Sequence, residues 1–130
     1  MIKAALIFEV VAVTEEAARK SLEKHLKKLS EDRRVKVLRT EMSEAEKIEN
    51  FSERIREAFS VIADAEIETN RFDNLLQIVI EFGPSSVELL SPDRIELSIS
   101  EAQGILNSVS SVMHRFVAAG GTGGIIIVND

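Results

Sequence analysis

Apolar and polar positions divide the chain into segments with the two-residue period of strands and segments with the helical period. Residues 2–13 carry apolar side chains in both alternating sets, as in a central strand that is covered on both faces. A helix over residues 14–29 should follow, because Thr14 can cap it and apolar residues recur at helical spacing. The expected stripe of that helix is Ala18, Leu22, Leu26 and Leu29.

The middle of the chain contains one ambiguous segment and one clear strand. Residues 34–37 alternate basic and apolar positions and indicate a half-buried strand. In residues 43–60, Ser43 and Glu46 form a capping box ahead of helically spaced apolar residues, so a helix is predicted, with a long β-ribbon as the competing interpretation. Residues 61–69 then predict a strand, with apolar residues on one face and carboxylates on the other.

Two further helices are predicted in the second half. Asn70 with Asp73 should begin one of them, and Gly83 followed by proline should end it. An extended segment over residues 87–90 and a short strand over 95–99 come next. Ser100 with Gln103 has the spacing of a capping box for the last helix, and a short apolar strand follows its glycine-rich end.

This order of elements predicts an α+β fold within a single domain, residues 1–130. Two β-α-β units separated by an inserted segment match a ferredoxin-like split βαβ sandwich with an antiparallel sheet, here with an added C-terminal helix and a short C-terminal strand. Two helices would cover one face of the sheet. The other face would be open, although Ala5, Ile7, Val11 and Val13 point toward it.

A family resemblance lies in the run from Asn70 to Pro92, which contains Gly83-Pro84 and Val87-Glu88-Leu89-Leu90. This run resembles the helix, Gly-Pro break and Val-Glu-x-Leu strand of small uncharacterised archaeal proteins with a ferredoxin-like fold. It is also similar to the C-terminal extension of WYL-type bacterial regulators, but neither a WYL core nor a helix-turn-helix is visible in the sequence. The resemblance therefore implies a fold and transfers no functional residue.

Composition removes several classes of chemistry. The 130 residues include no cysteine, which excludes disulfides, thiolate catalysis and cysteine-ligated metals, and no cofactor or metal site is predicted. Glu9 interrupts the N-terminal apolar run, so that run reads as a strand rather than a secretory signal. No apolar run approaches the roughly 20 residues of a membrane helix, and the expected location is the cytoplasm.

Basic residues are concentrated between positions 19 and 39, where nine Lys and Arg meet three acids in a chain of net charge −6. This segment is the candidate surface for nucleic acid or for an acidic partner. The residues expected to contact such a partner are Lys20, Lys24, Lys27, Lys28 and Arg34. No aromatic residue in the segment offers a stacking platform, so a solvated helix face is favoured over nucleic-acid binding.

Three other features are weighed as sites. His25 lies among the leucines of the first helix and is expected to bond to a backbone group rather than to act as a base or ligand. Asp64, Glu66 and Glu68 share a strand face, where they could bind a cation or, more simply, pair with Arg34 and Lys36 on a neighbouring strand. The glycine-rich residues 120–124 follow a helix instead of preceding one, which indicates a hinge rather than a phosphate loop.

The last helix carries the strongest prediction of assembly. Opposite its apolar stripe lie Gly104, Ser108, Ser111 and Arg115, whereas ordinary surface helices carry lysine and glutamate there. Small residues of low charge permit close approach of a partner, so we expect a homo-oligomer, a dimer or a multiple of dimers. The terminal apolar residues Ile125, Ile126 and Ile127 would join that interface.

The function expected from the sequence is that of a non-enzymatic oligomeric module that binds a small ligand at a subunit interface. Two alternatives stay open: a nucleic-acid-associated protein that uses residues 19–39, and an enzyme that uses the carboxylates of residues 64–68 or His25.

Overall fold

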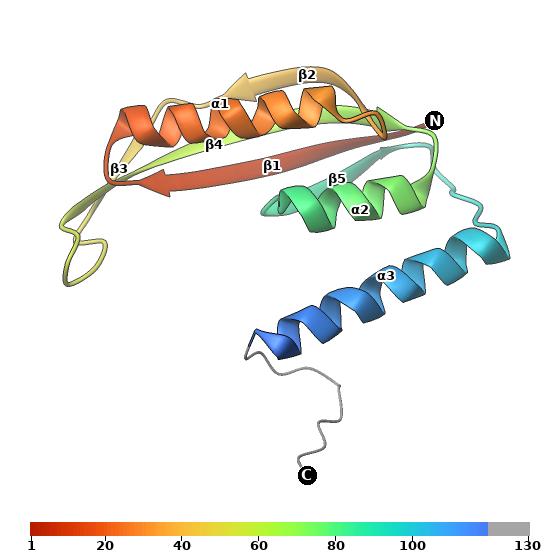
Figure 1. Ribbon diagram of the computed structural model, residues 1–130. Coiled ribbons are helices and arrows are strands. Elements are labelled where there is room, and N and C mark those ends of the chain that lie inside the picture. Colours follow the sequence, from red (N-terminus) through yellow and green to blue (C-terminus); the bar gives the residue numbers. More distant parts are fainter. Residues whose placement is uncertain (120–130) are drawn as a thin grey trace, which may run out of the picture. The chain divides into compact units, whose positions relative to one another are not determined.

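A computed structural model describes residues 1–119 of a chain that divides into two compact units, Met1–Ile95 and Glu96–Asp130. The first unit holds a five-stranded antiparallel open sheet and two helices, and the described part of the second holds one helix (Figure 1). The protein is therefore of the α+β class, as its sequence predicts.

The sheet is built from five strands, β1 (Ile2–Ala12), β2 (Lys36–Met42), β3 (Glu46–Glu49), β4 (Glu57–Thr69) and β5 (Ser86–Ser91). Its main path runs β2-β4-β1-β5, and β3 pairs with the first residues of β4. All neighbours are antiparallel. Consequently β1 and β2 run in the same direction with β4 between them, and β1 lies between β4 and β5.

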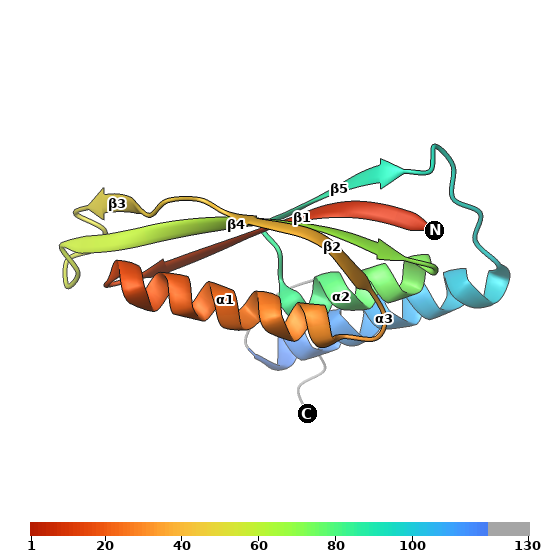
Figure 2. The ribbon, with the colours of Figure 1, turned by 90° about the horizontal axis from the view of Figure 1, so that it is seen from above.

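Helices α1 (Glu15–Glu31) and α2 (Phe72–Phe82) lie on one face of this sheet (Figure 2). The core lies between them and the sheet because alternate residues of the two central strands point toward the helices. The sheet residues that belong to the buried apolar core are Ile2, Ala4, Leu6, Phe8, Val61, Ala63, Ala65 and Ile67. On the opposite face Ala5 and Ile7 are half-buried and Val11 is exposed.

Helix α1 matches its prediction. The Oγ1 atom of Thr14 accepts a hydrogen bond from the backbone N–H of Ala17 at 3.1 Å, which satisfies one of the free donors of the first turn. The four predicted stripe residues are all buried against the sheet. The helix ends at Glu31, two residues later than expected, with Asp32 as its C-cap.

The predicted helix over residues 43–60 is wrong, and the competing β-ribbon is the observed structure. Ile48 of β3 pairs with Ala58 of β4 across a turn in which Asn50 has a φ of 55°. Asparagine tolerates this left-handed conformation better than most residues. The apolar spacing of this segment fits a helix, but a ladder with a strand that also pairs with β1 and β2 overrides the local pattern.

Helix α2 ends as predicted but begins differently. Gly83 is the C-cap with a φ of 61°, and its N–H bonds to the carbonyl of Val79 at 3.0 Å. The predicted cap at Asn70 is wrong, because Arg71 occupies the N-cap position without a side-chain cap bond. The guanidinium of Arg71 instead binds the carboxylate of Asp73 at 2.8–2.9 Å.

The predicted strand over residues 95–99 is absent, and the last helix, α3 (Ile99–Ala118), begins earlier than expected. Its cap is Ser98, whose Oγ accepts from the N–H of Glu101 at 3.0 Å, rather than Ser100 with Gln103. Ser98 and Glu101 have the same spacing as the predicted pair, so both capping boxes were available in the sequence. None of the described helices combines the length and apolar character that crossing a membrane requires.

Candidate functional site

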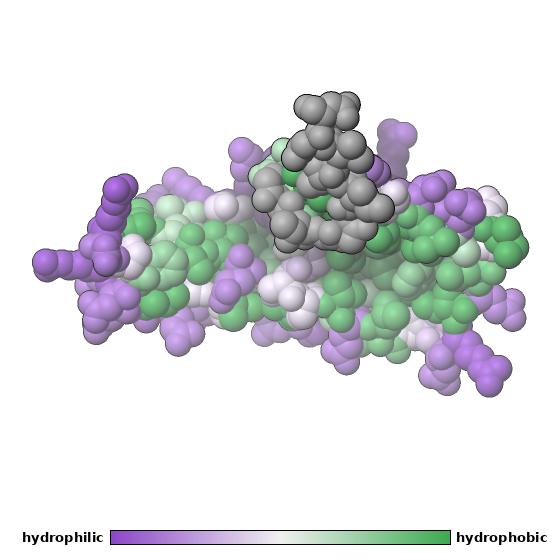
Figure 3. All heavy atoms as spheres, turned by 90° about the horizontal axis from the view of Figure 1, so that it is seen from below, coloured by the Kyte–Doolittle hydropathy of each residue, from purple (hydrophilic) through white to green (hydrophobic). Residues whose placement is uncertain are grey.

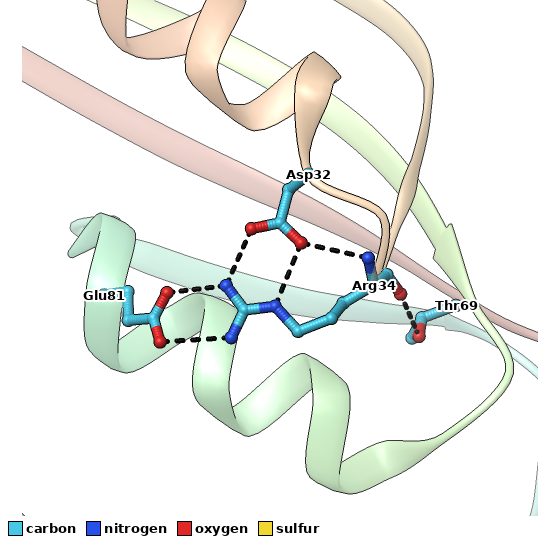
Figure 4. Close-up of polar contacts among 4 residues, drawn as sticks. All are labelled: Asp32, Arg34, Thr69 and Glu81. Carbon is cyan, nitrogen blue, oxygen red and sulfur yellow. Dashed lines mark hydrogen bonds and ion pairs between the residues drawn. The ribbon is translucent and has the colours of Figure 1, made fainter.

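Arg34 of the predicted basic surface is half-buried and forms hydrogen bonds and ion pairs within the first unit (Figure 4). Its Nε and Nη2 donate to the carboxylate of Asp32 at 2.9 and 2.7 Å, and its Nη1 donates to Glu81 Oε1 at 3.0 Å. Its backbone carbonyl accepts from Thr69 Oγ1 at 2.9 Å. The guanidinium thus joins the end of α1 to the last turn of α2.

These contacts change the titration of the pair. Hydrogen bonds from the Arg34 side chain hold the pKa of Asp32 below its usual value. The same bonds, first to Asp32 and then to Glu81, raise the pKa of Arg34 further above its already high value. The cluster is an ion-pair network between the C-cap of α1 and the last turn of α2.

The four lysines of the predicted basic surface all lie exposed on α1. Lys20 pairs with Glu16 at 3.0 Å, and an open surface hollow beside it is lined by three glutamates as well as by Arg19 and Lys20. Among residues 1–119, Lys24, Lys27 and Lys28 form no ion pair. The four lysines thus lie on an exposed face of α1 that has acids at its edge.

The carboxylates Asp64, Glu66 and Glu68 do share one face of β4, as predicted, and they point away from the helices. Lys36 lies opposite Glu68, but the cation opposite Glu66 is Arg39 and not Arg34. The Arg39 Nε atom is 3.7 Å from Glu66 Oε2. Within the described part of the chain, no three histidine or carboxylate side chains are grouped as metal ligands.

His25 has the backbone bond that its position predicts. Its Nε2 lies 2.7 Å from the carbonyl oxygen of Phe82, and since a carbonyl can only accept, Nε2 carries the proton. The imidazole also makes edge contacts with Phe8 and Phe82, with ring centroids 5.1 and 5.3 Å apart. A cavity of about 210 Å³ adjoins the ring, between β1, α1 and the end of α2.

The surface that the sequence did not reveal is an apolar groove between α2 and β5, which we call the α2/β5 groove. It has a volume of about 330 Å³ and is lined by Phe72, Leu75, Leu76, Val79, Val87 and Leu89. Val87 is 40% exposed and Leu89 is 50% exposed. Figure 3 shows that hydrophobic side chains reach the surface over a wide area of one view of the molecule.

A signal for this groove was present in the sequence. Phe72, Leu76 and Val79 recur at helical spacing along α2. Val87 and Leu89 are apolar residues at alternate positions of β5, so they project from the same face of that strand. Leu75 and Ile78 are the buried residues of α2, and Phe72 and Val79 are partly buried against the core while they also line the groove. The groove is therefore marked by apolar residues of α2 and β5 that the core covers only in part.

The residues predicted for an interface on α3 lie along one side of that helix at steps of three and four residues. Gly104 and Ser108 are half-buried, and Ser111 and Arg115 are exposed. A Cβ atom at Gly104 would meet nothing within 4 Å. The three terminal isoleucines predicted for the same interface lie outside the described residues, as does the glycine-rich segment before them.

Comparison with known proteins places the chain in a family without adding a solved relative. No curated protein and no solved structure matches it. A family model named for an archaeal protein matches residues 3–127, nearly the full length of the chain. The protein therefore belongs to the MJ0538 family.

Proposed function

We propose that this protein is a non-enzymatic module of ferredoxin-like plan that assembles with copies of itself and holds a small ligand where subunits meet. The plan is supported by the strand order β2-β4-β1-β5, in which α1 connects β1 to β2 across β4 and α2 connects β4 to β5 across β1. Two crossovers of this kind on one face of an antiparallel sheet make the split βαβ arrangement.

The observation that carries the proposal is the α2/β5 groove at the edge of the sheet. Among residues 1–119, β5 pairs only with β1, so its outer edge has free backbone groups next to the exposed side chains of Val87, Leu89 and Leu90. Proteins that stay monomeric usually protect such an edge with charge, proline or a covering element. An exposed apolar edge is typical of a surface that meets a partner.

A second surface supports the same proposal. The described residues of the second unit form one helix, so no other described element of that unit covers its apolar stripe. Leu106 is 66% exposed and Phe116 is 50% exposed. The side of this helix that we propose to approach a partner copy carries Gly104, Ser108, Ser111 and Arg115.

The distribution of titratable side chains favours binding over catalysis. His25 adjoins the cavity on the helix-covered side of the sheet, whereas Glu66 and Glu68 project from the opposite face. A general acid and a general base need to reach one substrate together. Because these groups do not line one pocket, they do not form a catalytic set.

The mass of the protein in solution tests the proposal. Light scattering on the size-exclusion peak at micromolar concentration should give a molar mass that is a multiple of the 14.4 kDa of one chain and larger than that of a single copy. Leu89→Lys should lower that mass, whereas Leu38→Lys on the opposite edge strand should not, although Leu38 is itself 39% exposed. A strict monomer across the accessible concentrations would refute the assembly.

Absorbance tests for the ligand in the same sample. The chain has no tryptophan, tyrosine or cysteine, so the pure protein is nearly transparent in the near ultraviolet. Absorbance there that co-elutes with the protein and is released by denaturation would identify a bound aromatic cofactor or nucleotide. The oligomeric mass and the absorbance are read independently.

A further inference from the structure

The central strand β1 has an open edge over residues 8–12, which we call the β1 open edge. Strand β5 pairs with residues 3–7 of β1, so it runs beside only part of that strand (Figure 1). The pairing ends at Ile7, whose carbonyl accepts from the N–H and the Oγ of Ser85 at 2.7 and 3.1 Å. On its other side β1 stays paired with β4 as far as Ala12. Within the described part of the chain, no strand covers the outer side of residues 8–12.

The backbone groups of Glu9 and Val11 point out of this edge. The N–H and C=O of one strand residue point to the same side, and successive residues alternate between the two sides. Because the carbonyl of Ile7 points toward β5, the backbone groups of Glu9 and Val11 point the same way. Among residues 1–119 these groups form no hydrogen bond. The edge therefore offers two donors and two acceptors at the spacing of an extended chain.

A cavity beneath the same edge provides room for a side chain. Its volume is about 210 Å³, and its lining includes Phe8, Glu9 and Val10 of β1, Ser21, Leu22 and His25 of α1, and Phe82 of α2. This is less than the roughly 300–1,000 Å³ of pockets that enclose a whole small molecule, so the cavity fits one side chain of a longer ligand. Phe8 and Leu22 are buried and Phe82 is half-buried, which favours an apolar side chain.

We infer that the β1 open edge binds an extended peptide segment of a partner protein, with one apolar side chain of that segment in the cavity beside His25. In this mode of recognition, pairing with the backbone supplies affinity and a pocket for a side chain supplies specificity. Residues directly opposite each other in paired strands project from the same face. Val10 projects toward the helices and packs against the core, so the peptide residue opposite Val10 would point toward the cavity.

The sequence of the edge does not oppose such pairing. Residues 8–12 include no lysine and no proline, which are the residues that commonly protect an exposed strand edge. Glu9 is the one charged residue among them. The inference goes beyond the proposed assembly, because it concerns a different edge of the sheet from the α2/β5 groove.

A synthetic peptide and NMR of the full chain test the inference. The probe is the acetylated and amidated peptide Lys-Thr-Thr-Leu-Thr-Thr-Lys, in which threonine favours the extended state and leucine is the apolar side chain. In the free chain, the amide protons of Glu9 and Val11 should exchange rapidly with solvent, unlike those of Phe8 and Val10, which face β4. The probe at millimolar concentration should slow the exchange at Glu9 and Val11 and shift the ring signals of His25.

Changes to the probe and to the chain separate the two parts of the site. Alanine in place of the leucine of the probe should weaken binding about tenfold, because the apolar contact with the cavity is lost. Val11→Pro removes an outward N–H at an edge position where proline is tolerated, and it should abolish binding. Val11→Thr keeps that N–H and should bind the probe as the unmodified chain does. Ser21→Phe, at an exposed position on the cavity wall, should remove the preference for leucine over alanine.

Circular dichroism checks the fold of each variant, and the comparison of the two probes on the unmodified chain needs no variant. Protection of Glu9 and Val11 that depends on the leucine of the probe supports the inference. Equal binding of the leucine and alanine probes, or no change at these two amides, would overturn it. Slow exchange of both amides in the free chain would also overturn it, because the edge would then already be covered. The molar mass that tests the assembly is a separate measurement, so either proposal can fail alone.

Discussion

The imidazole of His25 donates from Nε2 to the backbone carbonyl of Phe82 at 2.7 Å, so the middle of α1 is joined to the last residue of α2. That carbonyl belongs to the last turn of a helix, where carbonyl groups lack an intrahelical partner. The hydrogen bond and the edge contacts of the imidazole with Phe8 and Phe82 join α1 to β1 and to the end of α2. His25 is therefore a structural residue of the first unit.

Replacing His25 should separate its two contributions. His25→Phe keeps an aromatic ring but loses the donor to Phe82, at an expected cost of about 1 kcal/mol. His25→Ala loses the ring as well and should cost about 2 kcal/mol, less than a fully buried aromatic because the site is half-buried. Denaturant unfolding followed by circular dichroism measures both, with the exposed neighbour Lys24→Ala as a control that should change little.

Arg34→Ala should lower the free energy of unfolding by about 1–3 kcal/mol, because Asp32 and Glu81 both lose a charged hydrogen-bond donor. Arg34→Lys should recover only part of this, since a lysine cannot make two bidentate contacts. Arg33→Ala changes an exposed arginine one position earlier and controls for charge. Equal stability of the Arg33 and Arg34 variants would contradict the structural role.

Acid stability should depend on Asp32. Its pKa is lower in the folded state than its ordinary value of about 3.9, so its contribution is complete above that value and is lost as pH falls through the folded pKa. The unmodified protein should therefore lose more unfolding free energy between about pH 5 and pH 2 than Asp32→Asn does. Asp93→Asn, at an exposed position, is the control for removing one surface carboxylate.

Gly83 should resist replacement through its backbone alone. Its φ is 61°, and an added Cβ would meet nothing within 4 Å, so the cost is conformational and not steric. Gly83→Ala should lower the free energy of unfolding by about 1–2 kcal/mol. Gly83→Asn should lower it less, because asparagine tolerates the left-handed region. Similar losses for both variants would indicate a different cause.

The sequence predicted correctly those elements in which a single buried face requires apolar residues at a regular spacing. Strand β4 alternates strictly from Val61 to Thr69, and the stripe of α1 recurs at three and four residues, so each pattern has one interpretation. Residues 43–60 were misassigned because their apolar spacing satisfies a helix equally well. The pairing of β3 with β4 favours strands over a helix in this segment, and the local sequence pattern contains no sign of that pairing.

The candidate sites divide in the same way. The backbone bond of His25 was predicted from its place among the leucines of one helix. The engagement of Arg34 was not, because Glu81 is 47 positions away and meets it only once α2 packs beside α1. The α2/β5 groove was also missed, since its outer wall exists only where β5 pairs with β1.

The charged edge strand β2 bears on how the sheet avoids uncontrolled growth. Lys36, Arg39 and Glu41 are exposed along this strand, so another strand that paired there would have to bring its own side chains against these charges. Strand addition at this edge is therefore disfavoured, which protects the sheet from polymerisation on that side.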